Sequence, residues 1–370
     1  MITATQIEMA LNHVNDPDLG QSLIQLGMID NIEIDGQKVS FDLVLTTPAC
    51  PMRNQMSQAC VEAIHHYVDR NAEVTVNLTS RPVDTQAADD EENGLMYVKN
   101  TILVASGKGG VGKSTVAVNL AVSLAKTGAR VGLVDADVYG PSVPIMFDVT
   151  KQDIYGEDHN GKTYMMPVEK YGIKLMSVGF MVDAEKALVW RGPMASNALK
   201  QILTETWWGE IDYLVVDMPP GTGDIQLTMA QSLPVTGAII VSTPQQVALA
   251  DVVRGVQMFR NSQIDIPVLG FVENMAYFTP AELPNNKYYI FGQGGCRRLA
   301  EEMGITLLGE IPLVQSIAES GDNGKPVSLW SDTPTPESEA FMQVAENTIR
   351  EISKVKHQQN CDCDCCHDHQ

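Results

Sequence analysis

The sequence predicts an α/β protein with a mostly parallel sheet flanked by helices, preceded by a small α+β domain. From Tyr97 onward, short apolar runs alternate with helical patterns, which is typical of a parallel sheet covered on both faces. One such run, residues 101–105, leads directly into the glycine-rich segment GKGGVGKST at 107–115 and then into a helical pattern. Strand, glycine loop and helix in this order indicate a phosphate-binding loop.

The first part of the chain is organised differently. We expect helices over 5–14 and 54–68, a hairpin formed by 29–34 and 39–45 that turns at Asp35-Gly36, and a strand over 74–78. Periodicity and turn residues support these elements. The predicted division is therefore a small domain at 1–82, an acidic linker at 83–96, an ATPase domain at 97–356 and a tail rich in Cys and His at 357–370.

Seven segments of the large domain have the apolar character of buried parallel strands. They are residues 101–105, 131–135, 173–178, 212–217, 237–242, 267–272 and 306–309. A helix is expected over 116–126, directly after the glycine loop, and a final helix over 336–356, with apolar residues at helical spacing.

Composition narrows the classes of partner. The 370 residues carry a formal net charge of −21, which argues against a general nucleic-acid surface and against an anionic membrane surface, because both are held mainly by Lys and Arg. The first residues lack the pattern of a signal peptide, and no apolar run approaches the roughly 20 residues of a membrane span. We therefore expect a cytoplasmic protein that binds neither nucleic acid nor membrane.

The loop itself predicts nucleotide chemistry. Its backbone N–H groups can surround a polyphosphate at the positive end of a helix dipole. The predicted nucleotide-binding residues are Gly107, Lys108, Gly109, Gly110, Val111, Gly112, Lys113, Ser114 and Thr115. Lys113 is expected to reach the β- and γ-phosphates of ATP, and the Ser114 hydroxyl is expected to bind Mg²⁺.

Two buried strands end in carboxylates that suit the rest of an ATPase site. Asp135 is expected near Mg²⁺, and Asp137 is the candidate for orienting the attacking water. Asp217 closes the strand YLVVD and is expected to hold Mg²⁺ directly or through water. The glycines of 218–224 favour a switch loop that changes shape on hydrolysis.

Longer motifs carry a family resemblance. The loop contains an additional lysine, Lys108, ahead of Lys113. With this lysine it resembles the deviant Walker A loop of the P-loop NTPases MinD, ParA and nitrogenase iron protein. Residues 208–224, with the motif DMPPGTGD, closely match the Mrp (ApbC-type) iron–sulfur cluster carrier ATPases, as do the segments DADVYGPSVP at 135–144 and FGQGG at 291–295. The small domain resembles the SufT-type iron–sulfur-assembly domain through its segments DPD at 16–18 and TPACP at 47–51.

The resemblance implies an ATP-hydrolysing homodimer that holds an iron–sulfur cluster, of the 4Fe–4S type, between its subunits. It implies that iron–sulfur assembly proteins and recipient apoproteins are its partners. It also implies that Lys108 stabilises charge at the partner's nucleotide and that Asn274 recognises adenine. On this basis Lys108, Lys113 and Asp137 are the predicted catalytic residues.

One family feature is missing. The family usually places Cys-x-x-Cys shortly after the Asn-Met pair, and those thiolates hold the bridging cluster. Here Pro280 and Leu283 stand at those positions, and neither can bind iron. Cys50 is expected at a helix entrance, as a reactive thiol or as a core residue.

Four cysteines gather at the other end of the chain. Cys361, Cys363, Cys365 and Cys366 supply soft ligands for an iron–sulfur cluster or zinc. The tail predicts cluster ligation or metal delivery; a tail that only scavenges metal is the alternative. Two other functions remain open: a positioning switch of the ParA or MinD kind, and a metallochaperone that uses the tail.

Overall fold

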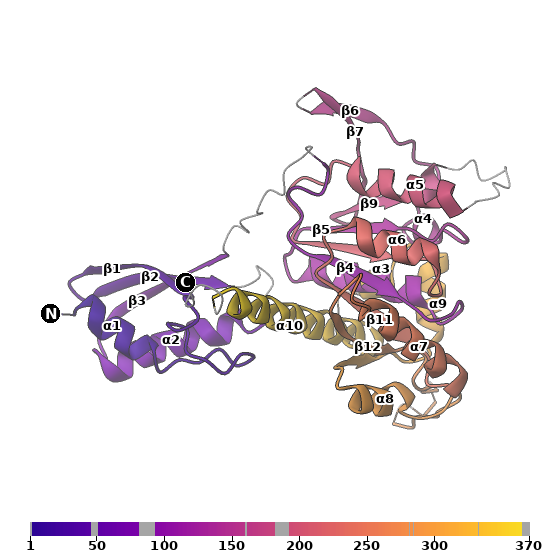
Figure 1. Cartoon of the computed structure of the whole chain (residues 1–370). Coiled ribbons are helices and arrows are strands. Elements are labelled where there is room, and N and C mark those ends of the chain that lie inside the picture. Colours follow the sequence, from indigo (N-terminus) through magenta and orange to yellow (C-terminus); the bar gives the residue numbers. More distant parts are fainter. Residues whose placement is uncertain are drawn as a thin grey trace. The chain divides into compact units, whose positions relative to one another are not determined.

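The computed structural model divides the chain into two compact units (Figure 1). The first contains Met1–Asp84 and Ile349–Gln370, and the second contains Thr85–Thr348. The structure describes residues 2–45, 51–80, 93–159, 161–181, 192–280, 282–283, 285–331 and 333–364. Each unit has its own hydrophobic core.

The first unit packs two helices on a three-stranded sheet. Its elements are α1 (Ala4–Leu11), β1 (Ile29–Asp35), β2 (Lys38–Leu45), α2 (Arg53–Tyr67) and β3 (Glu73–Ser80). Strand β2 pairs antiparallel with β1 and parallel with β3. Helix α1 begins at a capping box in which Thr3 accepts from the Gln6 backbone N–H. Ile7, Phe41 and Ile64 are fully buried between helices and sheet.

The second unit is built on an eight-stranded sheet. Its strands are β4 (Thr101–Ala105), β5 (Val131–Asp135), β8 (Val168–Lys170), β9 (Ile173–Ser177), β10 (Tyr213–Asp217), β11 (Gly237–Ser242), β12 (Val268–Glu273) and β13 (Leu307–Glu310). Their order is β13-β12-β11-β4-β10-β5-β9-β8. Every neighbouring pair is parallel except β8 with β9. This arrangement confirms the predicted fold class.

Helices cover both faces of this sheet (Figure 1). The α-helices of the unit are α3 (Lys113–Lys126), α4 (Val143–Met146), α5 (Gly192–Thr204), α6 (Asp224–Ser232), α7 (Gln246–Phe259), α8 (Gly295–Met303), α9 (Gln315–Asp322) and the first part of α10 (Pro336–Asp364). Helix α3 packs on β4, β5 and β10. The core cluster formed with α5, α6, α7 and α8 contains Leu103 and Ala105, which alternate along β4 with the buried Ile102 and Val104.

The sheet order places the glycine loop at a topological switch point. Strand β4 lies between β10 and β11, and the chain leaves β4 through α3 to reach β5 on the far side of β10. Ligands of open parallel sheets bind beyond the carboxyl ends of the strands where the winding direction reverses. Residues that directly follow β4, β5 and β10 therefore meet at one edge.

The differences from the expected elements have local causes. The strands β6 (Gly156–His159), β7 (Lys162–Met165) and β8 were not predicted, because these three- and four-residue segments carry little apolar alternation. The seven strands that were predicted in the large domain agree with the structure to within one residue at each end. The N-terminal helix ends at Leu11 rather than 14, and the hairpin turns at Gly36-Gln37.

The final helix is longer than expected and is shared by the two units. It reaches Asp364 rather than 356, and its residues from Ile349 onward belong to the first unit. There Arg350 Nε lies 3.7 Å from Asp18 Oδ1, and Arg350 Nη2 lies 3.7 Å from Met52 Sδ. The sequence prediction had assigned the helix entirely to the ATPase domain.

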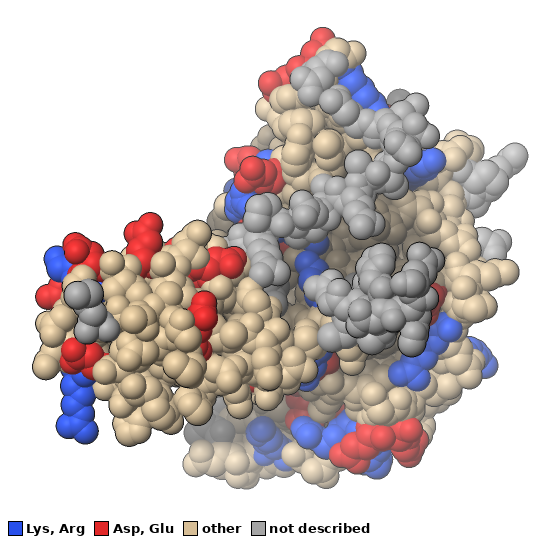
Figure 2. Space-filling view, turned by 60° about the vertical axis from the view of Figure 1, so that its left-hand side comes forward, with Lys and Arg blue, Asp and Glu red and all other residues tan. Residues whose placement is uncertain are grey.

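Charged side chains of both signs occur on one face of the molecule. On the face shown in Figure 2, the described Lys and Arg side chains lie singly or in small groups among Asp and Glu. No helix within the described residues combines the length and apolar character that a membrane crossing requires.

Candidate functional site

The glycine loop has the backbone conformation that a phosphate cradle needs. Gly110 and Gly112 have φ values of 79° and 80°, in the left-handed region that favours glycine. Gly107 is required for another reason: a Cβ atom there would lie 2.5 Å from the backbone carbon of Asp251 in α7. The loop is thus fixed between β4, α3 and α7.

Lys113 begins α3 and is buried, with a side chain 6% exposed. Its ammonium lies 2.6 Å from Asp217 Oδ1, 3.6 Å from Asp137 Oδ2 and 3.3 Å from the Ser114 hydroxyl. The structure therefore brings together four of the predicted site residues, from α3 and from the ends of β5 and β10.

Asp217 fits the expected magnesium site. It is completely buried, and its Oδ2 atom has no hydrogen-bond partner among the described residues, whereas Oδ1 accepts from Lys113. Burial raises the pKa of Asp217, and Lys113 opposes that shift. A buried carboxylate oxygen with an unused lone pair, beside a hydroxyl, is the kind of donor set that Mg²⁺ and its bound waters use. Ser114 and Asp217 are the residues that would hold the ion.

Asp135 has other partners. Its Oδ2 accepts from the Val143 backbone N–H at 3.1 Å and from the Ser177 hydroxyl at 3.0 Å, while Oδ1 accepts from the Asp137 backbone N–H. Burial, followed by repulsion from Asp217, raises its pKa. These contacts order the segment that follows β5. The structure thus gives Asp135 a positioning role, and magnesium ligation by it stays a prediction.

The Asp137 side chain lies close to Lys113 at the end of the glycine loop. Its side chain is 13% exposed, and its Oδ1 accepts from the Tyr139 backbone N–H at 3.1 Å. Oδ2 faces the Lys113 ammonium. These contacts place the Asp137 carboxylate beside the glycine loop, and the orientation of the attacking water by Asp137 stays a prediction.

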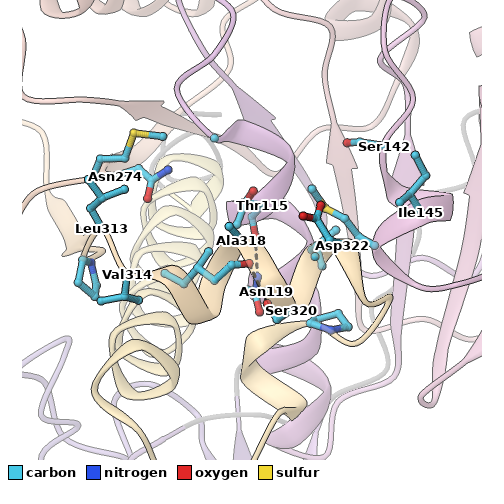
Figure 3. Close-up of a pocket in the computed structure, with 18 residues that line it drawn as sticks. Thr115, Asn119, Ser142, Ile145, Asn274, Leu313, Val314, Ala318, Ser320 and Asp322 are labelled. Atoms are coloured by element: carbon cyan, nitrogen blue, oxygen red, sulfur yellow. Dashed lines mark hydrogen bonds between the residues drawn. The ribbon is translucent and has the colours of Figure 1, made fainter. Parts of the chain in front are cut away.

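Asn274 connects the glycine loop with a pocket. It follows β12, is 5% exposed, and donates its side-chain amide to the Val111 carbonyl at 2.8 Å. The adjoining pocket has a volume of about 370 Å³ and extends past α3 to α4 and α9 (Figure 3). Thr115, Leu313 and Val314 are among its lining residues. This mainly apolar pocket beside a phosphate loop suits a nucleoside.

Lys108 is half-buried in the same loop. Its backbone carbonyl accepts from the Ser106 hydroxyl at 2.9 Å, and no ion pair within the described part of the chain involves its ammonium. The chemistry expected of this residue depends on a second subunit and stays a prediction.

Sequence reasoning missed Gln226. This buried side chain in the first turn of α6 bonds to three residues of the 218–224 loop. A glutamine three residues after a glycine at a helix start is a recognisable capping signal, and it was available in the sequence.

The segment after Asn274 forms a short β-bridge instead of a thiolate site. Phe278 and Tyr288 exchange two backbone hydrogen bonds of 2.8 Å, and Phe278 also bridges to Leu313. The Lys287 ammonium lies 3.8 Å from the Tyr277 ring centre. With Pro280 and Leu283 in this segment, no cysteine lies between Asn274 and Gly295.

The structure describes the side chains of two of the seven cysteines. Cys60 and Cys296 are buried free thiols, and burial raises the pKa of Cys60 to about 12. Cys361 and Cys363 lie in the last turns of α10, but nothing is described of their side chains, and Cys365, Cys366 and Cys50 lie outside the described residues. No cluster of three or more metal-ligating side chains occurs within the part of the chain that the structure describes.

Comparison with known proteins decides the family. Residues 97–349 match the family described as NUBPL iron-transfer P-loop NTPase, in the ParA group. The chain belongs to this family. Residues 4–78 match a second family, described as iron-sulfur cluster assembly protein. Both matches confirm the resemblance noted in the sequence.

Some relatives match nearly the whole chain. An iron-sulfur cluster carrier protein of Synechocystis is 43% identical over 95% of this chain and 99% of its own length. The carrier protein of Deinococcus radiodurans is 45% identical over 93% of this chain and 94% of its own.

Solved structures support the fold of the NTPase unit. A nucleotide-binding protein of Archaeoglobus fulgidus, solved in complex with ADP, is 37% identical, with a TM-score of 0.56 over 66% of this chain and 95% of that chain. The cell-division ATPase MinD of Pyrococcus furiosus, 21% identical with a TM-score of 0.51 over 68% of this chain and 98% of its own, shares the fold.

Proposed function

We propose that this protein is an ATP-hydrolysing carrier that binds iron–sulfur clusters and transfers them to recipient apoproteins. ATP binding and hydrolysis are supported by one observation: Lys113, Ser114, Asp137 and Asp217 come together at one end of β4. The relatives that match nearly the whole chain are named iron-sulfur cluster carrier proteins, which supports an iron–sulfur cluster as the cargo.

The chain's own residues divide the hydrolysis among them. The loop N–H groups and Lys113 bind and orient the phosphates, and Asn274 positions the base in the adjoining pocket. Ser114 and Asp217 would hold Mg²⁺, which would supply positive charge to neutralise the phosphates. Asp137 orients the attacking water. Lys108 of a second copy supplies further positive charge, which makes the active form a homodimer.

The cluster needs ligands that the segment after Asn274 does not offer. We propose that the cargo, a 4Fe–4S cluster, is held by thiolates of the tail, from among Cys361, Cys363, Cys365 and Cys366. Thiolate ligands persist in a reducing compartment, which supports a cytoplasmic site of action. Iron–sulfur assembly proteins are the proposed donors.

Anaerobic reconstitution with iron and sulfide tests the ligands. The full chain is compared with one truncated after Asn360, and iron, sulfide and visible absorbance are measured per protein chain. We expect the truncated chain to lose most of its cluster. Equal cluster content in both would contradict the role of the tail. Zinc in place of iron after anaerobic purification would favour a metallochaperone.

Transfer is tested with a cluster-dependent apoenzyme whose activity returns on loading. The loaded carrier is mixed with the apoenzyme with and without Mg-ATP, and Lys113→Met serves as the matched variant. We expect transfer by both proteins, and a response to ATP only in the unmodified chain. Absence of any transfer would refute the carrier function, and equal rates with and without ATP would refute the coupling.

A further inference from the structure

Gln226 occupies an unusual position between the end of β10 and helix α6. It is 4% exposed and lies in the first turn of α6, while the loop 218–224 lies directly before it in the chain. This loop contains two consecutive prolines, Pro219 and Pro220, which carry backbone carbonyls but no N–H groups.

The side-chain amide of Gln226 meets this loop at three points. Its Nε2 atom donates to the Pro219 carbonyl at 3.2 Å and to the Pro220 carbonyl at 2.7 Å. Its Oε1 atom accepts from the Gly223 backbone N–H at 2.9 Å. Both amide hydrogens and one carbonyl lone pair are therefore used within the loop.

The loop that Gln226 holds is hydrogen-bonded at two points to residues in and directly after the last part of β4. On one side, the Met218 backbone N–H donates to the Val104 carbonyl of β4 at 3.0 Å, directly after Asp217. On the other, the Gly221 backbone N–H donates to the Ser106 carbonyl at 2.9 Å, and the Ser106 hydroxyl donates to the Lys108 carbonyl. The conformation of 218–224 is thus tied to the loop that carries both lysines.

We propose that Gln226 is a positioning residue for ATP hydrolysis: its amide fixes the backbone of 218–224 at the distance from the glycine loop that the hydrolytic step requires. The assignment rests on the proposed ATPase function. Because both of its amide hydrogens are already donated to the loop, the role assigned to Gln226 is to hold the backbone of 218–224, which differs from that of the glutamine that orients the attacking water in some P-loop NTPases.

A matched set of variants tests this role. Gln226→Met keeps the length of the side chain and removes all three hydrogen bonds. Gln226→Glu keeps an acceptor for Gly223 but turns a carboxylate toward two carbonyl oxygens. Gln231→Met changes an exposed glutamine of the same helix and is the control. ADP affinity, kcat, KM and thermal unfolding are measured for each, together with hydrogen exchange of the Gly221 and Gly223 amides.

We expect kcat to fall at least about tenfold in both Gln226 variants, because small displacements of positioning groups are costly to the chemical step. ADP affinity should stay within about twofold, since the hydrogen bonds that Lys113 makes to Asp217 and that Asn274 makes to Val111 do not involve Gln226. The Gly223 amide should exchange faster in Gln226→Met, and Gln231→Met should match the unmodified chain. The Glu variant decides the question if the Met variant does not fold.

Two results would overturn the proposal. One is a kcat within twofold of the unmodified chain in either folded Gln226 variant. The other is a parallel loss of kcat, ADP affinity and thermal stability, which would mean that Gln226 only supports the fold. If the unmodified chain does not hydrolyse ATP, the proposed function fails instead. The exchange of Gly223 then decides separately whether Gln226 holds the loop: unchanged exchange refutes the contact, and faster exchange supports it.

Discussion

Lys113 and Asp217 form a buried ion pair, with 2.6 Å between the ammonium and Oδ1, that joins the start of α3 to the end of β10. The two residues are 104 positions apart in the chain. The pair places the positive charge of the glycine loop next to the acid expected to hold the metal, so both groups are oriented by the fold itself.

Removing one partner of this pair should destabilise the protein. Lys113→Met leaves the Asp217 carboxylate without its cation, and a broken buried pair typically costs about 3 kcal/mol or more. Urea unfolding without nucleotide measures the loss. The double variant Lys113→Met/Asp217→Asn should recover part of it, because the buried Asp217 charge is then removed together with its cation. A double variant less stable than Lys113→Met would contradict this explanation.

Two glycines of the loop should respond differently to the same substitution. Gly107→Ala would press a Cβ atom against the Asp251 backbone and should cost about 1–3 kcal/mol of folding free energy. Gly109→Ala meets no atom within 4 Å and should change it by less than about 0.5 kcal/mol. Unfolding curves without nucleotide separate the two. Equal losses would mean that the approach of α7 does not constrain the loop.

Asn274→Ala should weaken nucleotide binding by about tenfold or more, because the base loses a polar partner and the Val111 carbonyl loses its donor. Calorimetric titration with ADP measures the change. Inorganic tripolyphosphate, which has no base, is the matched ligand and should lose much less affinity. The same loss for both ligands would show that Asn274 acts through the glycine loop alone.

Glu273 should make the free energy of unfolding depend on pH. Burial raises the pKa of this carboxyl group above its ordinary value of 4.5, although its Oε2 accepts from the Cys296 backbone N–H. Because the pKa of Glu273 is higher in the folded than in the unfolded state, its contribution to the free energy of unfolding is fully present below pH 4.5. This contribution is lost as the pH rises through the pKa of the folded state.

The matched variant for this effect is Glu273→Gln, which does not titrate. We expect the unmodified chain to gain stability relative to Glu273→Gln as pH is lowered from 8 to 4.5, measured by urea unfolding at each pH. A difference that stays constant, or grows in the opposite direction, would show that the charged form of Glu273 is the one that the fold favours.

The parallel sheet and its glycine loop could be predicted because their signals are local. The run 101–105, the loop at 107–115 and the acids that follow β5 and β10 are each contiguous in the sequence. The partners of Asp135 could not be predicted, because Ser177 lies 42 residues away on a neighbouring strand. Periodicity also cannot detect strands of three or four residues such as β7 and β8.

Helix α10 constrains how this protein can be dissected. The family match of the NTPase ends at residue 349, the position at which the helix passes from the second unit to the first. An NTPase fragment that ends at residue 349 would keep only the first part of α10. The complementary N-terminal fragment would lack the helical turns that place Arg350 beside Asp18. The N-terminal unit is therefore completed by the part of α10 that begins at Ile349, and genetic swaps between relatives must exchange this part of the helix together with the N-terminal domain.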